Sequence, residues 1–255
     1  MASQLERILF VPDTHAPNHD VRAWNLMMSA ARGFKPNVVV SMGDLADFFA
    51  VSTWSKDPSR AFKLDEEVAV VNELLDDLDS LKAKRSIFVA GNHEDRLRRY
   101  LQDKAPELFP LLNVPDLFRL DKRGWEYVPY KANTQLGKLY LTHDIGSAGR
   151  YDVFKTLDTF QHSVVTAHTH RLAYAVEGNA TGEAAVGAQF GWLGDVSTVD
   201  YMHQVKALRN WALGFGIGYL EPKTGHVYLV PVPIVKYTCV VEGTLYESPT
   251  TKRGR

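Results

Sequence analysis

Residues 37–47 read NVVVSMGDLAD, and this stretch decides the fold. Its first six residues are mostly apolar and β-branched, which is typical of a short strand buried on both faces. Strands of this kind belong to parallel sheets that are covered by helices. Gly43-Asp44 follows at once, so we expect a carboxylate at the carboxyl end of this strand.

The same pattern recurs on both sides of this stretch. We predict strands at Ile8–Val11 and Ser86–Ala90. Two amphipathic helices separate the three strands: Val21–Arg32, closed by Gly33, and Leu64–Lys84, whose apolar residues recur at helical spacing. The β-α-β-α-β order predicts a parallel sheet with helices packed against it.

The second half of the chain is richer in strands. Five more are predicted, at Lys138–Thr142, Ser163–Ala167, Leu172–Val176, Phe215–Leu220 and His226–Pro233. The last two form a hairpin, and a helix is expected over Arg150–Phe160. We predict a long loop for the segment rich in glycine and alanine from Gly178 to Gly194. We expect one domain over residues 1–246, with a polar, flexible tail over 247–255.

The composition excludes several classes of protein. The chain has 255 residues, 45% of them hydrophobic and 23% charged, as in an ordinary globular protein. Its formal net charge of -1 gives no general attraction to nucleic acid or to anionic membranes, although a local basic groove stays open. The single cysteine, Cys239, rules out an intramolecular disulfide, and no apolar run approaches the ~20 residues that span a membrane. We therefore expect a cytoplasmic protein without a membrane segment.

Side chains of types that can bind metal ions follow five of the predicted strands. They are Asp13, His15, Asp44, Asn92, His93, His143, His168 and His170. In open α/β sheets, ligands bind beyond the carboxyl ends of the strands. One such residue alone is more commonly a helix cap, a turn residue or a packed residue. Five strand ends with the same property, holding five of the nine histidines, predict a shared site.

The spacing and chemistry of these residues indicate a metal centre. The first and last of the five groups each contain two residues that are two positions apart, and in an extended chain such side chains point to the same side. Asp44 and Asn92 each follow a glycine, which allows the backbone to approach an ion closely. Imidazoles, carboxylates and an amide oxygen, without thiolates, favour Mn²⁺, Fe, Zn²⁺ or Ni²⁺.

Five separated blocks of sequence resemble the calcineurin-like metallophosphoesterases. The blocks are Asp13-Thr14-His15, Gly43-Asp44-Leu45-Ala46-Asp47, Gly91-Asn92-His93-Glu94, His143 and Ala167-His168-Thr169-His170. Their order and approximate separations agree with the family over residues 8–175. Ala167 departs from the glycine that is usual at its position. The stretches 91–96 and 210–215 are most similar to short phage and bacterial members of the family.

The resemblance implies a fold and a ligand set. The fold is a single-domain four-layer αββα sandwich of the α/β class, with mixed sheets and two divalent metal ions at the strand ends. Manganese is the first candidate, and iron, zinc and nickel are alternatives. Carried over by position, one ion takes Asp13, His15, Asp44 and His170, and the other takes Asp44, Asn92, His143 and His168. His93 matches the family's general acid, and Asp47 matches the carboxylate that pairs with it.

The implied reaction is the hydrolysis of a phosphomonoester or phosphodiester. A metal-activated hydroxide attacks phosphorus, Asn92 helps to neutralise the phosphate oxygens, and His93 protonates the leaving oxygen. A small molecule or a nucleotide is the favoured substrate, and nucleic acid is an alternative. Arg96 either holds a phosphate oxygen or is a solvated residue of the basic run that follows it; both interpretations stay open.

Two other functions stay open. A Mn-dependent DNA nuclease of the repair-nuclease branch needs a basic track for the nucleic-acid backbone, and only residues 96–104 and 252–255 offer one. A base could stack on Trp54, Trp192 or Trp211, although large aromatic residues more commonly pack in a core. A non-catalytic protein-binding scaffold is the third candidate, and the intact ligand set argues against it.

Overall fold

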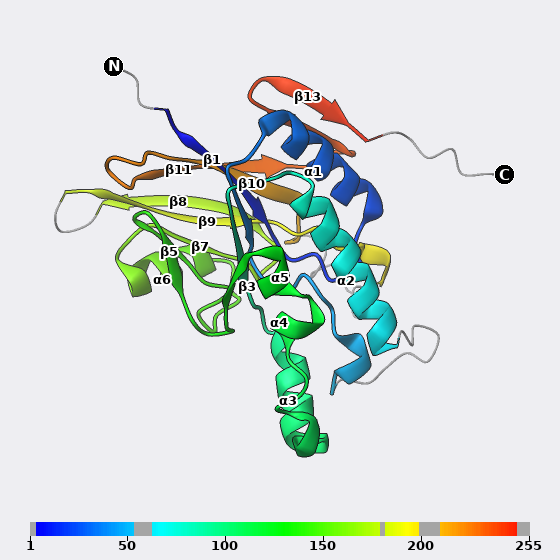
Figure 1. Ribbon diagram of the computed structural model, residues 1–255. Helices are drawn as coiled ribbons and strands as arrows, with labels where there is room; N and C mark the ends of the chain where they lie inside the picture. The colour runs from blue at the N-terminus through cyan, green and yellow to red at the C-terminus, as the bar shows by residue number, and fades with distance from the viewer. Residues whose placement is uncertain (1–3, 54–62, 179–181, 199–209, 249–255) are drawn as a thin grey trace.

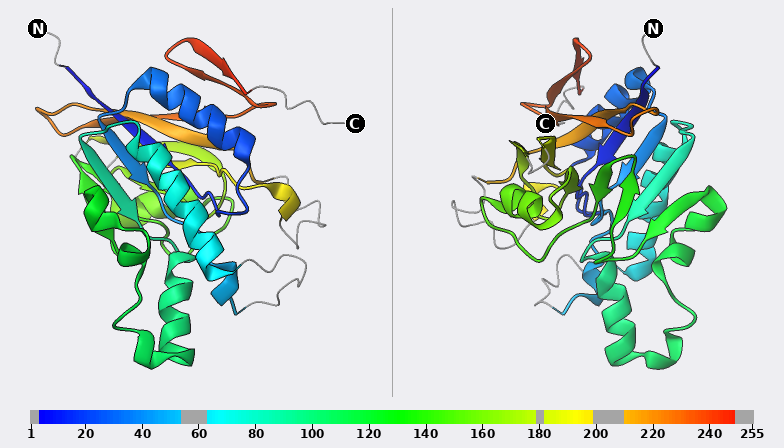
Figure 2. Two further views of the ribbon diagram at one scale, coloured as in Figure 1. Left: turned by 45° about the vertical axis from the view of Figure 1, so that its right-hand side comes forward. Right: turned by 90° about the vertical axis from the view of Figure 1, so that its left-hand side faces the viewer.

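The computed structural model describes residues 4–53, 63–178, 182–198 and 210–248, which form four layers (Figures 1 and 2). Helices α1 (Val21–Phe34) and α2 (Leu64–Asp79) cover one face of a six-stranded sheet. The other face of this sheet packs against a five-stranded sheet, whose outer face is covered by α6 (Asp152–Phe160). The predicted αββα sandwich with mixed sheets is thereby confirmed.

The six-stranded sheet has the order β11-β10-β1-β2-β3-β4. Strands β1 to β4 are parallel, and β10 is antiparallel to both of its neighbours. The strands are Glu6–Val11 (β1), Val38–Ser41 (β2), Arg85–Val89 (β3), Trp125–Val128 (β4), Gly214–Leu220 (β10) and Val227–Pro233 (β11). The predicted β-α-β-α-β order and the later hairpin are both confirmed.

The five-stranded sheet has the order β5-β6-β7-β9-β8. Strands β6, β7 and β9 are parallel, and β5 and β8 are antiparallel edge strands. The strands are Thr134–Leu136 (β5), Leu139–Leu141 (β6), Val164–Thr166 (β7), Leu172–Gly178 (β8) and Ala184–Phe190 (β9).

The predicted loop from Gly178 to Gly194 is wrong, because β9 lies within it and pairs with both β7 and β8. The small residues of this segment have a packing reason. A Cβ at Gly187 would press against Val153 and Leu157 of α6. Glycine and alanine therefore mark the place where a helix approaches the strand closely, and not an absence of regular structure.

The remaining elements are short. They are α3 (Glu94–Lys104), α4 (Val114–Leu117), α5 (Leu120–Arg123), the 3₁₀ turns Phe49–Val51, Pro106–Leu108 and Val196–Thr198, and the hairpin of β12 (Thr238–Val241) and β13 (Thr244–Glu247). Among the described residues no helix is both long and apolar enough to cross a membrane. Helix α3 and the turn after it extend away from the body of the molecule (Figure 1).

Several predicted boundaries differ from the structure. Helix α1 continues through Gly33 to Phe34 and ends at Lys35 in the left-handed conformation; a Cβ at Gly33 would overlap Tyr246 of β13. Helix α2 ends at Asp79, before the expected Lys84. Glu247, the expected first residue of the tail, is the last residue of β13. Residues 249–255 lie outside the described residues, so the tail itself stays a prediction.

The core explains why polar residues gather at one edge of the sandwich. Alternate residues of β1 to β3, such as Phe10 and Val40, pack between the two sheets, while their neighbours, such as Leu9 and Val39, pack under α1 and α2. Both faces of these strands are therefore apolar. The polar side chains that follow each strand lie at its carboxyl end.

Candidate metal centre

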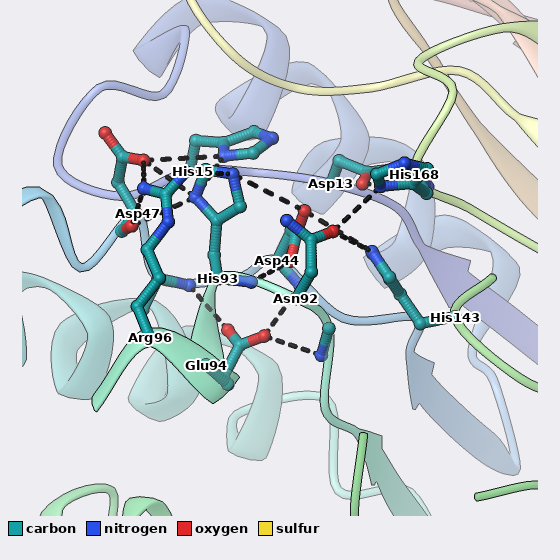
Figure 3. Close-up of polar contacts among 12 residues, drawn as sticks. Asp13, His15, Asp44, Asp47, Asn92, His93, Glu94, Arg96, His143 and His168 are labelled. Carbon is teal, nitrogen blue, oxygen red and sulfur yellow. Dashed lines mark hydrogen bonds and ion pairs between the residues drawn. The ribbon is translucent and has the colours of Figure 1, made fainter. Parts of the chain in front are cut away.

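The seven predicted ligands lie together at the carboxyl ends of β1, β2, β3, β6 and β7. Figure 3 labels all of them except His170. Three groups of side chains offer ligand atoms that lie within 4.8 Å of one another: Asp13, His15 and His170; His15, Asp44 and His93; and Asp44, His143 and His168. Asp44 belongs to two of these groups. It lies near His15 and His93 in one group and near His143 and His168 in the other.

Individual distances show how closely the donor atoms converge on either side of Asp44. On one side, Asn92 Oδ1 lies 2.8 Å from His168 Nδ1 and 3.1 Å from His143 Nε2. His143 Nε2 is 3.3 Å from Asp44 Oδ2. On the other side, His15 Nε2 and His170 Nε2 are 3.0 Å apart. His170 Nε2 also lies 3.8 Å from Asp13 Oδ1.

The backbone at the centre is not extended, so the expected reason for the two-residue spacing is wrong. His15, Asp44, His168 and His170 all have positive φ, between 50° and 66°. Residues other than glycine rarely adopt this left-handed backbone conformation, and backbone strain of this kind is concentrated at functional sites. The turn at His168 and His170 directs the two imidazoles to different groups, His168 to Asp44 and His143, and His170 to Asp13 and His15.

The loop after β2 and the loop after β3 approach each other closely at Asp44. Glycines at positions 43 and 91 permit this approach, as the sequence suggested. Gly43 has φ +97°, and a Cβ at Gly91 would overlap Asp44 Oδ1. His93 N donates to the same oxygen at 2.8 Å. The loop after β3 thereby holds the carboxylate that the loop after β2 carries.

Glu94 joins these two loops, a role that the sequence did not reveal. Its buried carboxylate accepts three backbone hydrogen bonds: Oε2 from Gly91 N (2.7 Å) and Asp44 N (2.9 Å), and Oε1 from Ala46 N (3.0 Å). Burial raises the pKa of Glu94, and the nearby carboxylate of Asp44 adds to the increase. The only signal in the sequence was its place directly after His93.

Further contacts orient the imidazoles. His143 Nδ1 donates to Met42 O at 2.8 Å, which directs Nε2 toward Asp44. Trp192 stacks on His170, with ring centroids 4.9 Å apart and an interplanar angle of 9°. Trp211 meets the same imidazole edge-on at 4.2 Å. Because Trp192 is only 4% exposed, it packs behind His170 and does not offer a face to a base. Trp54 lies outside the described residues.

The electrostatics of the pocket suit a cation. Burial raises the pKa of Asp13 to about 7. Burial also acts upward on the pKa of Asp44, but His143 and His93 outweigh it and hold that pKa well below its usual range. His143 shows the converse: burial opposes its protonation, yet the Asp44 carboxylate raises its pKa to about 10. The carboxylates therefore attract positive charge.

Burial favours the neutral form of two further imidazoles, those of His168 and His170. Burial, with the neighbouring histidine His15, holds the pKa of His170 well below its usual value, and burial with His143 lowers that of His168. Neutral imidazole is the form that binds metal. His170 Nδ1 is buried without a hydrogen-bond partner among the described residues. The donor set thus fits divalent ions that accept mixed nitrogen and oxygen ligands.

His93, Asp47 and Arg96 form a cluster beside the metal-capable groups (Figure 3). His93 Nδ1 lies 2.8 Å from Asp47 Oδ1. Arg96 Nη1 donates to Asp47 O at 2.8 Å, and its Nη2 lies 2.9 Å from His93 Nε2. Burial acts upward on the pKa of Asp47, but hydrogen bonds to His15 and His93 hold it well below its usual range.

Arg96 is therefore separated from the basic run that follows it. Its side chain is 15% exposed and forms an ion pair with Asp47. Arg98 and Arg99 are exposed and pair with Asp95 instead. The interpretation of Arg96 as a solvated residue is therefore wrong. Its contact with a phosphate stays a prediction.

Comparisons with known proteins relate the chain to one family. A family model described as calcineurin-like phosphoesterase matches residues 6–217. Gene 54 protein of Mycobacterium phage D29 is 27% identical and that of Mycobacterium phage L5 is 26% identical, and each comparison covers 95% of this chain and 99% of the phage protein. Among solved structures, vacuolar protein sorting 29 from Cryptosporidium parvum shares 16% identity over 94% of both chains, with a TM-score of 0.48. A likeness at that level carries no argument about activity.

Proposed function

The chain belongs to the calcineurin-like phosphoesterase family, and on that premise we propose that it hydrolyses phosphoesters with two divalent metal ions. One observation carries the proposal. Asp44 shares one group of donor atoms with His15 and His93 and another with His143 and His168, and Asn92 lies beside the second, as a shared ligand requires. The complete set of donors argues against a non-catalytic scaffold.

The proposed ligand sets follow the two sides of Asp44. One ion is assigned to Asp13, His15, Asp44 and His170, and the other to Asp44, Asn92, His143 and His168. Two bound ions would supply an activated water and neutralise charge on the phosphate oxygens. Manganese is the first candidate, and iron, zinc and nickel also suit these donors.

The chain's own residues have distinct tasks in this proposal. His93 donates a proton to the leaving oxygen, because imidazole ordinarily titrates near neutral pH. Asp47 holds the ring through its 2.8 Å contact with Nδ1. Asn92 directs Oδ1 toward His143 and His168, so its Nδ2 group serves as a donor to a phosphate oxygen. Arg96 Nη2 donates to His93 Nε2 at 2.9 Å, so this contact has to open before Nη2 can donate to a phosphate oxygen or Nε2 can carry the transferred proton.

The proposed substrate is a phosphorylated small molecule or a nucleotide. A nuclease needs a continuous basic track. The sequence offers two basic segments. In the first, residues 96–104, Arg98 and Arg99 form ion pairs with Asp95. The second, residues 252–255, lies outside the described residues. No specific observation therefore favours the nuclease.

A metal-loading experiment tests the proposal. The purified chain is treated with a chelator, reloaded separately with Mn²⁺, Fe²⁺, Zn²⁺ or Ni²⁺, and assayed on p-nitrophenyl phosphate and bis-p-nitrophenyl phosphate. Two bound ions per chain and metal-dependent hydrolysis are expected. Asp44→Asn should lose both, while Asp103→Asn on the exposed side of α3 should lose neither. Failure to bind a second ion, or activity that survives in Asp44→Asn, would falsify the proposal. Cleavage of single-stranded DNA alone would favour the nuclease.

A further inference from the structure

Strand β8 is an edge strand with one side unpaired. It is the outermost strand of the five-stranded sheet and bonds to β9 only. Arg171 O accepts a hydrogen bond from Gly191 N at 2.8 Å, so the odd-numbered residues of the ladder bond to β9. The backbone groups of the even-numbered residues in Leu172–Gly178 therefore point away from it. Within the described part of the chain, no strand pairs with them.

The other described sheet edges carry protection that β8 lacks. Edge strand β11 contains Pro231 and Pro233, which cannot donate a backbone hydrogen bond. Edge strands β4, β5, β12 and β13 have only three or four residues each. Strand β8 has seven residues, with no proline and no lysine, and exposes 47% of Tyr174 and 55% of Val176. Long apolar edges without such protection pair with another chain.

The residues of β8 are complementary to a second copy of the same strand. Antiparallel pairing centred on Tyr174 places Leu172 opposite Val176 and Arg171 opposite Glu177. The even-numbered residues that face each other then exchange the backbone hydrogen bonds that point away from β9. Around a two-fold axis every pair occurs twice, which is the property of an isologous interface.

The charges of Arg171 and Glu177 favour pairing centred on Tyr174 over pairing shifted by one residue. Arg171 and Glu177 lie on the same face of the sheet, at a pair with the shorter Cα separation of ~4.5 Å. Arg171 Nε and Nη1 are buried without a hydrogen-bond partner among the described residues. Pairing centred on Ala175 instead would place Glu177 opposite Ala173 and would lose the ion pair.

From the unprotected edge and its self-complementary register, we propose that the protein forms a two-fold homodimer by antiparallel pairing of β8 with β8 of a second copy. The five-stranded sheets of the two subunits then form one continuous sheet. The ligand pair His168 and His170 directly precedes β8, so the metal-capable site of each subunit lies next to the interface.

Sedimentation velocity and light scattering of the full chain over a concentration series test the dimer. The expected mass is twice the 28.6 kDa of one chain. Arg171→Glu and Glu177→Arg each place like charges opposite each other and should weaken association about tenfold or more. The double variant R171E/E177R reverses the ion pair and should restore association. Val176→Pro removes an N–H that points away from β9, so it should abolish the dimer without the loss of a bond within the subunit.

Tyr228→Glu, an exposed substitution on the protected edge strand β11, is the matched control and should leave the dimer intact. Thermal melting of each variant shows that it is folded. A wild-type chain that stays monomeric at every concentration overturns the proposal. So does a dimer that all three single β8 changes leave unaffected. A double variant that melts like the wild type but associates as weakly as the single variants contradicts the pairing of Arg171 with Glu177.

Discussion

Replacement of Glu94 by glutamine tests whether one carboxylate holds together the two loops that carry Asp44 and His93. Oε2 of Glu94 accepts two backbone hydrogen bonds and Oε1 accepts one. In glutamine the oxygen can take the position with two bonds. The amide nitrogen then faces Ala46 N, and two donors oppose each other. One buried N–H left without an acceptor costs about 1–3 kcal/mol, which is the expected loss in the free energy of unfolding.

Glu94→Ala extends the same calculation. Three buried N–H groups lose their acceptor, at about 1–3 kcal/mol each, while the removal of a buried carboxyl whose pKa is raised offsets part of that loss. We expect a net cost of about 3–5 kcal/mol. Both variants should also weaken Mn²⁺ binding about tenfold or more, because outer contacts of this kind orient metal ligands.

Urea denaturation with chelator present measures the stability of these variants, and titration calorimetry measures the affinity for Mn²⁺. Glu107→Gln and Glu107→Ala, on the exposed turn after α3, are the matched controls and should change neither quantity. If glutamine and alanine at position 94 cost the same, or if alanine costs less than about 1 kcal/mol, the reasoning from three accepted bonds is wrong.

Three further predictions concern the acid, the metals and a second buried carboxyl. His93→Ala should keep its metal ions but lose ~10²–10⁴ in rate on alkyl phosphates, and much less on p-nitrophenyl phosphate; equal losses would exclude a proton-donor role. Mn²⁺ at about 100 times its dissociation constant should add about 2.7 kcal/mol to the free energy of unfolding, and Asp44→Asn should remove this gain. Burial raises the pKa of Glu67 from 4.5 to about 7. Its folded pKa thus exceeds its unfolded one, so its stabilising contribution is complete below pH 4.5 and is lost as the pH rises through 7, by about 3 kcal/mol. Glu67→Gln should therefore gain stability relative to the wild type between pH 4.5 and pH 8, and a constant difference would contradict this assignment.

The elements that could be predicted from the sequence are those whose pattern is local and strong. Strands β1, β2 and β3 are apolar on both faces, and α1 and α2 have a continuous apolar stripe, so each shows its own periodicity. The strands that were not predicted, β4, β5, β12 and β13, have three or four residues each, and at least one residue of each is exposed. Strand β9 was mistaken for a loop because its small residues reflect the approach of α6, which no local pattern reports.

The same division separates the candidate ligands from the residues that hold them. Each ligand directly follows a strand, so its position could be predicted one segment at a time. Glu94 matters through Asp44, fifty positions away. Trp192 matters through the face of His170. Such contacts form only when distant segments have folded together. The left-handed backbone at four of the ligands could not be predicted for the same reason. This conformation is unfavourable locally, so it persists only because the surrounding structure imposes it.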